Sequence, residues 1–151
     1  MKWKGVAVWI ALSCLMVPQG WADPLFLRAT KQIDYQTALD DLFLAMNNHG
    51  YTSTKVQPVD QGLRAKGYEA PDYNLIFFGE KEQVDQVLAV NPEAAILLPL
   101  KIVLYREGDV VIAIAPSMEM WKGIFGGEAL NFMIDKWQKD VLSILHEFSR
   151  Q

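Results

Sequence analysis

The spacing of apolar residues predicts short strands that alternate with amphipathic helices. A strand is expected over residues 25–33, and Asp34 then offers a side-chain oxygen that can cap a helix. This helix should reach about Asn48, because its apolar positions recur at three- and four-residue steps. They are Tyr35, Ala38, Leu39, Leu42, Phe43 and Met46. Gly50 stands where a glycine commonly ends a helix, and residues 51–60 predict a second strand.

The middle of the chain predicts a polar connection, a buried strand and a second helix. Residues 61–71 are polar and contain glycine, whereas residues 74–78 form a short aromatic run that favours a third strand. Residues 80–90 have helical spacing. Four side chains are expected to face inward: Val84, Val87, Leu88 and Ala89. The pair Asn91-Pro92 should end this helix, because a residue before proline avoids the α region. Residues 94–98 then suit either a further helical turn or an extended lead-in.

Two nearly unbroken apolar runs, residues 100–105 and 110–115, flank the turn Glu107-Gly108-Asp109 and predict a β-hairpin. Pro99 cannot donate a ladder hydrogen bond, so it suits the start of the first strand. An antiparallel sheet with one face in water should alternate apolar with polar residues, and these runs do not. Both faces of the hairpin are therefore expected to be covered. Helices of the same chain can cover one face, and a remaining helix, a second subunit or an apolar ligand could cover the other.

The last part of the chain predicts one long helix after a loop rich in glycine. Ser117 is expected to cap a short segment over residues 118–122. Beyond Gly127, apolar residues recur at helical steps over five turns. They are Leu130, Met133, Ile134, Trp137, Val141, Ile144, Leu145 and Phe148. Met46 and Met133 lie on the two helical stripes, so packing is favoured over ligation of a soft metal.

The N-terminal residues have the pattern of a secretory signal. Lys2 and Lys4 precede a mainly apolar stretch of 13 residues, 5–17, which is too short to span a bilayer core of about 30 Å. Small residues stand three and one positions before the bond between Ala22 and Asp23. We expect cleavage at that bond.

This interpretation divides the chain into a signal peptide, residues 1–22, and a single domain, residues 23–151. A periplasmic or secreted location follows, with no membrane attachment of the mature domain. Lipidation at Cys14 and retention of the segment as an anchor are the two minority alternatives. Cys14 is the only cysteine, so cleavage removes it and leaves a domain without disulfides or cysteine nucleophiles.

The charge balance argues against nucleic-acid binding. The whole chain has a net charge of −4, and cleavage would remove two of its 14 basic residues. The mature domain would then carry 12 basic and 18 acidic side chains, a net charge of −6. Binding to a phosphate backbone needs a basic face, so we expect no nucleic-acid partner.

No catalytic or metal-binding motif stands out. The chain lacks a Gly-x-Ser-x-Gly elbow, a Walker loop and a dinucleotide fingerprint. His49 and His146 are far apart and have no metal-ligand spacing, so roles at helix ends are favoured. We therefore expect no catalytic residues, no metal and no cofactor, and a domain that is not an enzyme.

The glycine-flanked loop over residues 122–127 is unusual, because it carries Ile124 and Phe125. These side chains could plug the core or form an apolar lip over a groove. With Trp121 they would make a small hydrophobic patch that suits a partner or a ligand. The predicted contact surface comprises Trp121, Ile124, Phe125, Met118 and Tyr105.

Several stretches resemble the domain of unknown function 302 family, from about Thr30 to Phe148. The most specific are the aromatic strand with its glycine, Leu75 to Gly79, and the pair Leu98-Pro99 before a strand that ends in Tyr105. Ala115-Pro116, with Met118 after the hairpin, is a third. The resemblance implies an α+β fold like that of the TATA-binding protein. It would have an antiparallel sheet, a helix after the first strand and a long C-terminal helix.

The resemblance implies no activity or ligand. Many relatives have Gly-Asn-Pro where this chain has Gly79-Glu80-Lys81, and some exported relatives have a cysteine where this chain has Leu100. Thiol or metal chemistry of such relatives does not carry over to this chain.

The sequence thus predicts an exported, non-enzymatic binding or interaction domain that self-associates through its apolar sheet or binds an unknown protein. The alternative is a periplasmic carrier that holds a small apolar ligand between the sheet and the long helix.

Overall fold

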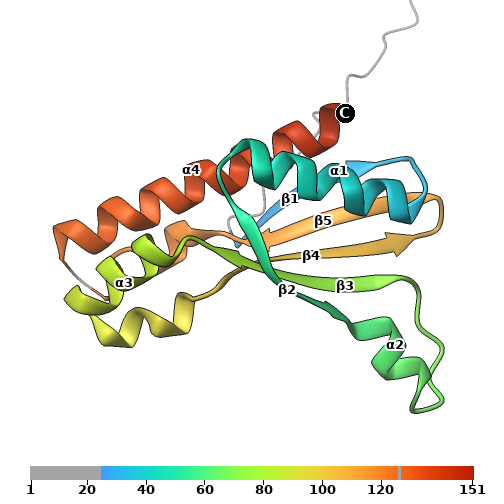
Figure 1. Ribbon diagram of the computed structural model, residues 1–151, viewed down its shortest axis with the longest axis horizontal. Helices are drawn as coiled ribbons and strands as arrows, with labels where there is room; N and C mark the ends of the chain where they lie inside the picture. Colours follow the sequence, from blue (N-terminus) through green and yellow to red (C-terminus); the bar gives the residue numbers. More distant parts are fainter. Residues whose placement is uncertain (1–24, 126) are drawn as a thin grey trace, which may run out of the picture.

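The computed structural model of the chain describes residues 25–125 and 127–151. The predicted signal peptide lies outside the described residues. The described part forms one antiparallel sheet of five strands in the order β1-β5-β4-β3-β2, with a helix after the first strand and a long C-terminal helix (Figure 1). The predicted α+β class and these three features are confirmed.

Apart from helix α2, the strands and α-helices follow one another in the predicted order. The strands are β1 Phe26–Lys31, β2 Thr52–Pro58, β3 Tyr73–Gly79, β4 Leu100–Glu107 and β5 Val110–Pro116. The α-helices are α1 Tyr35–Asn48, α2 Val59–Arg64, α3 Lys81–Val90 and α4 Glu128–Arg150. Two short 3₁₀ helices are η1 Pro92–Leu97 and η2 Met118–Trp121.

Helix α1 begins and ends as its sequence predicts. The Asp34 carboxylate accepts hydrogen bonds from the backbone N–H of Gln36 at 2.9 Å and of Thr37 at 3.3 Å. These bonds satisfy two of the free amides at the start of the helix. Gly50 follows the helix with a φ of 80°, a backbone conformation that other residues rarely adopt.

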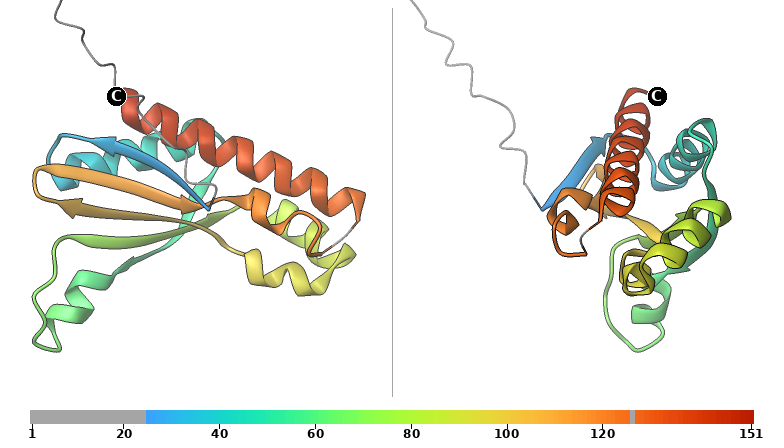
Figure 2. Two further views of the ribbon diagram at one scale, coloured as in Figure 1. Left: turned by 180° about the vertical axis from the view of Figure 1, so that it is seen from behind. Right: turned by 90° about the vertical axis from the view of Figure 1, so that its left-hand side faces the viewer.

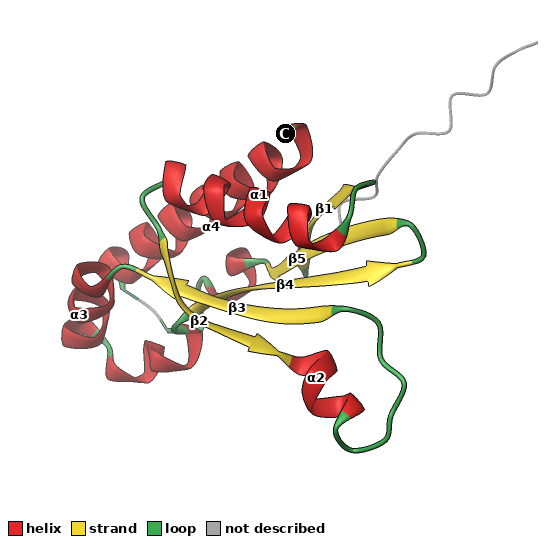
Figure 3. Ribbon diagram, turned by 45° about the vertical axis from the view of Figure 1, so that its right-hand side comes forward, coloured by secondary structure: helices red, strands yellow, loops and turns green. Residues whose placement is uncertain are grey.

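The polar connection predicted over residues 61–71 is partly wrong, because α2 extends from Val59 to Arg64. Asp60 lies in the first turn, where the helix dipole favours an acidic side chain. Arg64 lies one turn later, with its Nη1 atom 3.0 Å from Asp60 Oδ2. Figure 3 shows α2 at the far end of β2 and β3, away from the other helices.

Helices α1, α3 and α4 lie on one side of the sheet (Figure 2). The eight predicted apolar positions of α4 are all buried, as are Met46 and Met133. They pack with Leu100, Ile102 and Leu104 of β4 in one core. The layer between the sheet and α4, where the alternative interpretation placed a ligand, is therefore filled by side chains of the chain itself.

The opposite face of the sheet has no helix over β4 and β5 in the view from behind (Figure 2, left). Along β4 the side chains alternate between buried and half-exposed, and Val103 and Tyr105 are among the half-exposed ones. No helix of the described chain therefore covers this face of β4, whereas residues 111–113 of β5 are buried on both faces. A cover by a second subunit or a ligand stays a prediction. Unbroken apolar runs suggested two covers, and the chain supplies one.

Helix α3 differs from its prediction in which side chains it buries. Val87 is buried and Val84 and Leu88 are half-buried, but Ala89 is exposed and Gln83 is buried instead. Asn91-Pro92 ends the helix as predicted, and residues 92–97 form a 3₁₀ helix, which settles the two alternatives left open for this segment. The bond between Leu98 and Pro99 is cis.

Among the helices in the described part of the chain, none is both long and apolar enough to cross a membrane.

Candidate functional site

The helix-free face of the sheet carries apolar side chains from three neighbouring strands. The strand registers place Leu75 beside Val103, and Val103 beside Ile114. We call this surface the open face and define it by Tyr73, Leu75, Phe77, Val103, Tyr105 and Ile114. All six side chains are partly exposed, whereas Ile112 on the same side of β5 is only 1% exposed. An apolar surface of this kind is typical of a contact site.

Two opposite charges lie at the ends of β4 on the same open face. Lys101 precedes Val103 by two residues, and Glu107 follows Tyr105 by two. Because strand side chains alternate, all four point to one side of the sheet. Neither Lys101 nor Glu107 makes an ion pair within residues 25–125 and 127–151.

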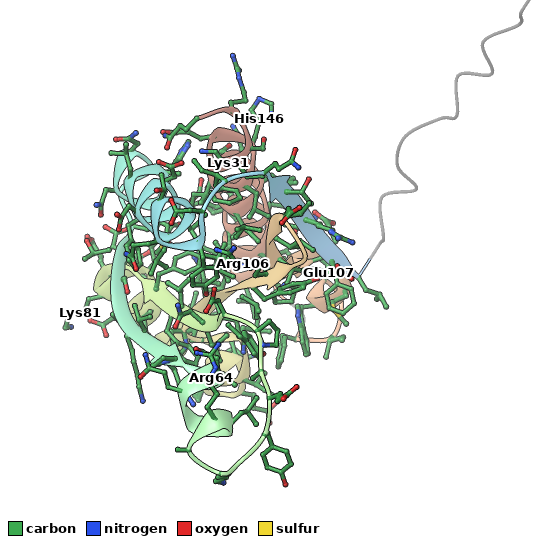
Figure 4. The ribbon with its side chains drawn as sticks, turned by 90° about the vertical axis from the view of Figure 1, so that its right-hand side faces the viewer. Lys31, Arg64, Lys81, Arg106, Glu107 and His146 are labelled. Carbon is green, nitrogen blue, oxygen red and sulfur yellow. The ribbon has the colours of Figure 1, made fainter. Side chains whose placement is uncertain are left out.

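Charged groups on the other side of the same strand are paired. Arg106 lies between Tyr105 and Glu107 but points to the helix side, with its guanidinium carbon 6.0 Å from the centre of the Tyr35 ring. Its Nε atom is 3.3 Å from Asp72 Oδ2. Figure 4 shows Arg106 and Glu107 at the hairpin end of β4, with Arg106 nearer the middle of the molecule.

The structure separates the residues of the predicted contact surface. Tyr105 belongs to the open face. Met118 is only 2% exposed, so it cannot contribute a contact, and that part of the prediction is corrected: its position at the start of η2 turns it into the core. Its backbone N–H donates a hydrogen bond to Gln138 Oε1 at 2.7 Å, which holds η2 against α4.

Trp121, Ile124 and Phe125 lie after β5, beyond the end of the sheet that is opposite the hairpin turn. The rings of Trp121 and Phe125 stack with centroids 6.0 Å apart, and both pack against the core. Ile124 is 62% exposed. Phe125 thus plugs the core, which is one of the two predicted alternatives, whereas Ile124 is exposed. Tyr105, near the hairpin turn, does not share a patch with them.

A polar cluster that the sequence did not reveal joins α3, α4 and the residue before β2. The Tyr51 hydroxyl donates to Asp140 Oδ2 at 2.6 Å, and Lys136 Nζ lies 2.6 Å from the same oxygen. Gln83 Oε1 accepts from Trp137 Nε1 at 2.7 Å. Tyr51 and Asp140 are 89 residues apart in the sequence, so no local motif predicts the contact.

The hydrogen bonds of this polar cluster indicate a structural role. Burial, together with the neighbouring Asp140 carboxylate, raises the pKa of Tyr51 well above its ordinary value, so the phenol stays protonated. A tyrosine held neutral in this way is a poor base near neutral pH. The Asp140 carboxylate is occupied by Tyr51 and Lys136, and the Gln83 carbonyl by Trp137. The cluster therefore fixes the helices against the sheet.

A groove of about 900 Å³ lies between α3 and the first turns of α4. Its walls are mainly apolar and include Val90 and Phe132, which are 63% and 69% exposed. Gln86 and Glu128 are its polar members. The volume falls in the upper part of the range for small-molecule pockets.

The two histidines lie where the sequence placed them, near helix ends. His49 is the C-terminal cap of α1, and its Nε2 atom is 3.0 Å from Glu147 Oε2 of α4. His146 lies in the last turns of α4. Within the described residues, no group of three or more histidine, cysteine, aspartate or glutamate side chains is arranged to hold a metal ion.

Comparison with known proteins agrees with this fold. The family model described as "Domain of unknown function DUF302" matches residues 27–148, so the chain belongs to that family. Search of the curated proteins gives no significant match.

A similar solved structure is that of an uncharacterised conserved DUF302 protein from Bacillus stearothermophilus. It superposes with a TM-score of 0.75 at 18% sequence identity, and the match covers 82% of this chain and 97% of that chain. At this level of identity the likeness supports the shared fold alone.

Proposed function

We propose that this protein is a non-enzymatic interaction domain that self-associates through its open face. The observation that carries the proposal is the row of partly exposed apolar side chains across β3, β4 and β5. Water contacts these side chains in the single chain, and removing them from water is worth about 25 cal/mol per Å². A second copy offers the same apolar surface and would supply the second cover that the sequence pattern predicts.

The size of the open face suits a modest dimer interface. The sheet has five strands, and its longest strand has eight residues. At a rise of about 3.3 Å per residue and a strand spacing of about 4.8 Å, the helix-free side of all five strands measures roughly 26 by 24 Å, or about 600 Å². The open face on β3, β4 and β5 makes up roughly 26 by 14 Å of it, or about 370 Å². A standard interface buries about 800 Å² per partner. A dimer that dissociates on dilution is therefore the expected form.

The cellular location of the domain is part of the same proposal. The basic and then apolar pattern of residues 1–22 supports export, so we propose that the domain acts in the periplasm or outside the cell. The mature domain would contain no cysteine, so burial of apolar side chains alone would hold its fold together there. The acidic balance of its charges disfavours nucleic acid as a partner.

Sedimentation velocity over a dilution series tests the proposal with two matched variants of residues 23–151. Val103→Glu places a charge in the centre of the open face, whereas Leu142→Glu places the same charge on α4, where Leu142 is 47% exposed. We expect the dimer for the unchanged domain and for Leu142→Glu, and a monomer for Val103→Glu. A monomer in all three samples at the highest concentration would refute self-association.

A second candidate function is the transport of a small apolar ligand, favoured by the groove between α3 and α4. This location differs from the layer between the sheet and the long helix. The test is the mass of the domain purified from an exporting host under native conditions. Extra mass that disappears in Phe132→Glu would support the carrier, because Phe132 lines the groove.

A further inference from the structure

We propose that two copies pair with their β4 strands antiparallel, so that Lys101 of each copy lies against Glu107 of the other. The inference rests on the proposed self-association and adds the relative orientation of the two copies. It also names the two side chains that specify this orientation.

The first step is the placement of charge along β4. On the open face this strand presents Lys101, Val103, Tyr105 and Glu107 in order, a cation and an anion with two apolar side chains between them. Neither charge has an ion-pair partner within the described parts of the chain. An apolar partner would bury charge without compensation, at considerable cost. A partner that places an anion opposite Lys101 and a cation opposite Glu107 would pair both charges.

The second step is symmetry. In a two-fold dimer the same surface meets itself, so a residue that contacts another is itself contacted by the equivalent residue. Two stacked sheets can be related by a two-fold axis that lies between them at right angles to the strands. Such an axis reverses the strand direction of the second copy. If the axis crosses β4 at Leu104, midway between the two charges, each Lys101 faces a Glu107.

The rest of the open face agrees with this axis. Leu104 is in register with Ala113 of β5 and Asn74 of β3, so the axis passes over these residues as well. Two apolar pairs then face each other across the interface, Val103 with Tyr105 and Tyr73 with Leu75. Ile114 lies opposite Ile112, which its own chain already buries. On the edge strand β1, where Ala29 is in register with Ala113, Arg28 faces Thr30. No two like charges oppose each other on β1, β4 or β5.

The other two-fold arrangement is disfavoured. An axis parallel to the strands and above β4 keeps the strand direction, so Lys101 would face Lys101 and Glu107 would face Glu107. Like charges in an interface cost several kcal/mol and exclude wrong pairings. The charges on β4 therefore select the antiparallel arrangement.

The distances across such an interface are within reach of these side chains. Stacked sheets pack about 10 Å apart, a gap that a lysine and a glutamate can bridge from opposite sides. Each charge lies about 10 Å along the strand from the axis, so the usual rotation of about 30° between aligned sheets moves it sideways by about 5 Å. Both side chains are long and flexible enough to follow.

Charge reversal tests the orientation. Lys101→Glu, Glu107→Lys and the double variant are compared by the dissociation constant of the dimer. We expect each single variant to raise it at least about tenfold, since both symmetric pairs become repulsive. The double variant should return to within about threefold of the unchanged domain, because the pairs are restored with their signs exchanged. The matched controls, Lys139→Glu and Glu82→Lys on the exposed surface of the helices, should leave it unchanged.

The outcomes separate the two proposals. If Val103→Glu abolishes the dimer but neither charge reversal changes it, the open face is the interface and the antiparallel pairing is wrong. If the unchanged domain is monomeric, both proposals fail. Thermal unfolding of each variant controls for loss of fold, and restoration by the double variant cannot arise from misfolding of the singles.

Discussion

The two faces of β4 and β5 are made by the same apolar runs but have different surroundings. On the helix side, Leu100, Ile102 and Leu104 are almost completely buried under α1 and α4. On the open side, Lys101, Val103 and Tyr105 alternate with them and are only partly covered. An unbroken apolar run therefore predicts two covered faces, but it does not report what covers each face.

The two faces also differ in how they treat charge. On the helix side, Arg106 is close to Asp72, and Lys31 pairs with Asp41 of α1. Lys31, which Figure 4 places in the upper part of the molecule, also lies 5.8 Å from the centre of the Phe148 ring. On the open side, Lys101 and Glu107 have no such partner in the described chain. The charges of the helix face are paired within one copy, and in the proposed dimer a second copy would pair those of the open face.

The largest expected effect comes from breaking the helix face. Trp137 is 1% exposed and donates its indole N–H to Gln83. Trp137→Ala should lower the free energy of unfolding by about 3–5 kcal/mol, because it leaves a large cavity and an unsatisfied amide. Urea denaturation measures this loss.

The matching change on the open face is Val103→Glu. It should lower the free energy of unfolding of the monomer by less than about 1 kcal/mol, while it abolishes the dimer. A loss of stability as large as that of Trp137→Ala would show that the open face is part of the core of a single chain.

An intermediate effect on stability is expected at the polar cluster around Tyr51 and Asp140. Tyr51→Phe keeps the ring, which packs edge-on against Phe78 with centroids 5.4 Å apart, and removes the hydroxyl bonded to Asp140. The free energy of unfolding should fall by about 1–2 kcal/mol. The exposed residue Tyr68 provides the control, since Tyr68→Phe should have no measurable effect. Equal stability of both variants would show that the hydrogen bond of the Tyr51 hydroxyl contributes nothing to the free energy of unfolding.

The smallest effect is a pH dependence. Burial raises the pKa of Tyr35 to about 12, while its hydroxyl donates to the Leu104 carbonyl at 3.0 Å. Tyrosine in the unfolded chain ionises near pH 10, so the native state keeps a proton that the unfolded state loses. This contribution to the free energy of unfolding is complete below about pH 10 and is lost as the pH rises toward about 12.

Tyr35→Phe removes that contribution. The fall in the free energy of unfolding between pH 9 and pH 11 should be smaller in this variant than in the unchanged domain, as measured by urea denaturation at each pH. Tyr51 contributes to the fall in both proteins, because its pKa is also raised. Identical slopes in the two proteins would contradict the role assigned to Tyr35.

Local patterns predicted most of the fold. The apolar stripe of α4 and the cap at Asp34 depend on residues within a few turns of each other, so the sequence shows them directly. Helix α2 was missed because its six residues have no apolar stripe, and the ion pair of Asp60 and Arg64 within it is too weak a signal to predict a helix. Ala89 was assigned to the wrong side of α3 because small residues at the edge of a stripe fit either side.

The candidate sites were less accessible to the sequence. Met118 and Tyr105 were assigned to one surface, but the direction of a side chain after a strand end depends on the local turn, which composition does not encode. The burial of Gln83 depends on Trp137, 54 residues away. The hairpin pattern predicted a second cover on the sheet, and this stays a prediction. The single chain leaves that cover open, and only the fold locates the missing side.

The most direct test of the central claim is native mass spectrometry of residues 23–151 across a dilution series. If the open face is an interface between two copies, the spectra will show a dimer without added mass that dissociates on dilution. Val103→Glu will then remain a monomer at every concentration. A monomer of the unchanged domain throughout the series, with or without a bound ligand, would contradict it.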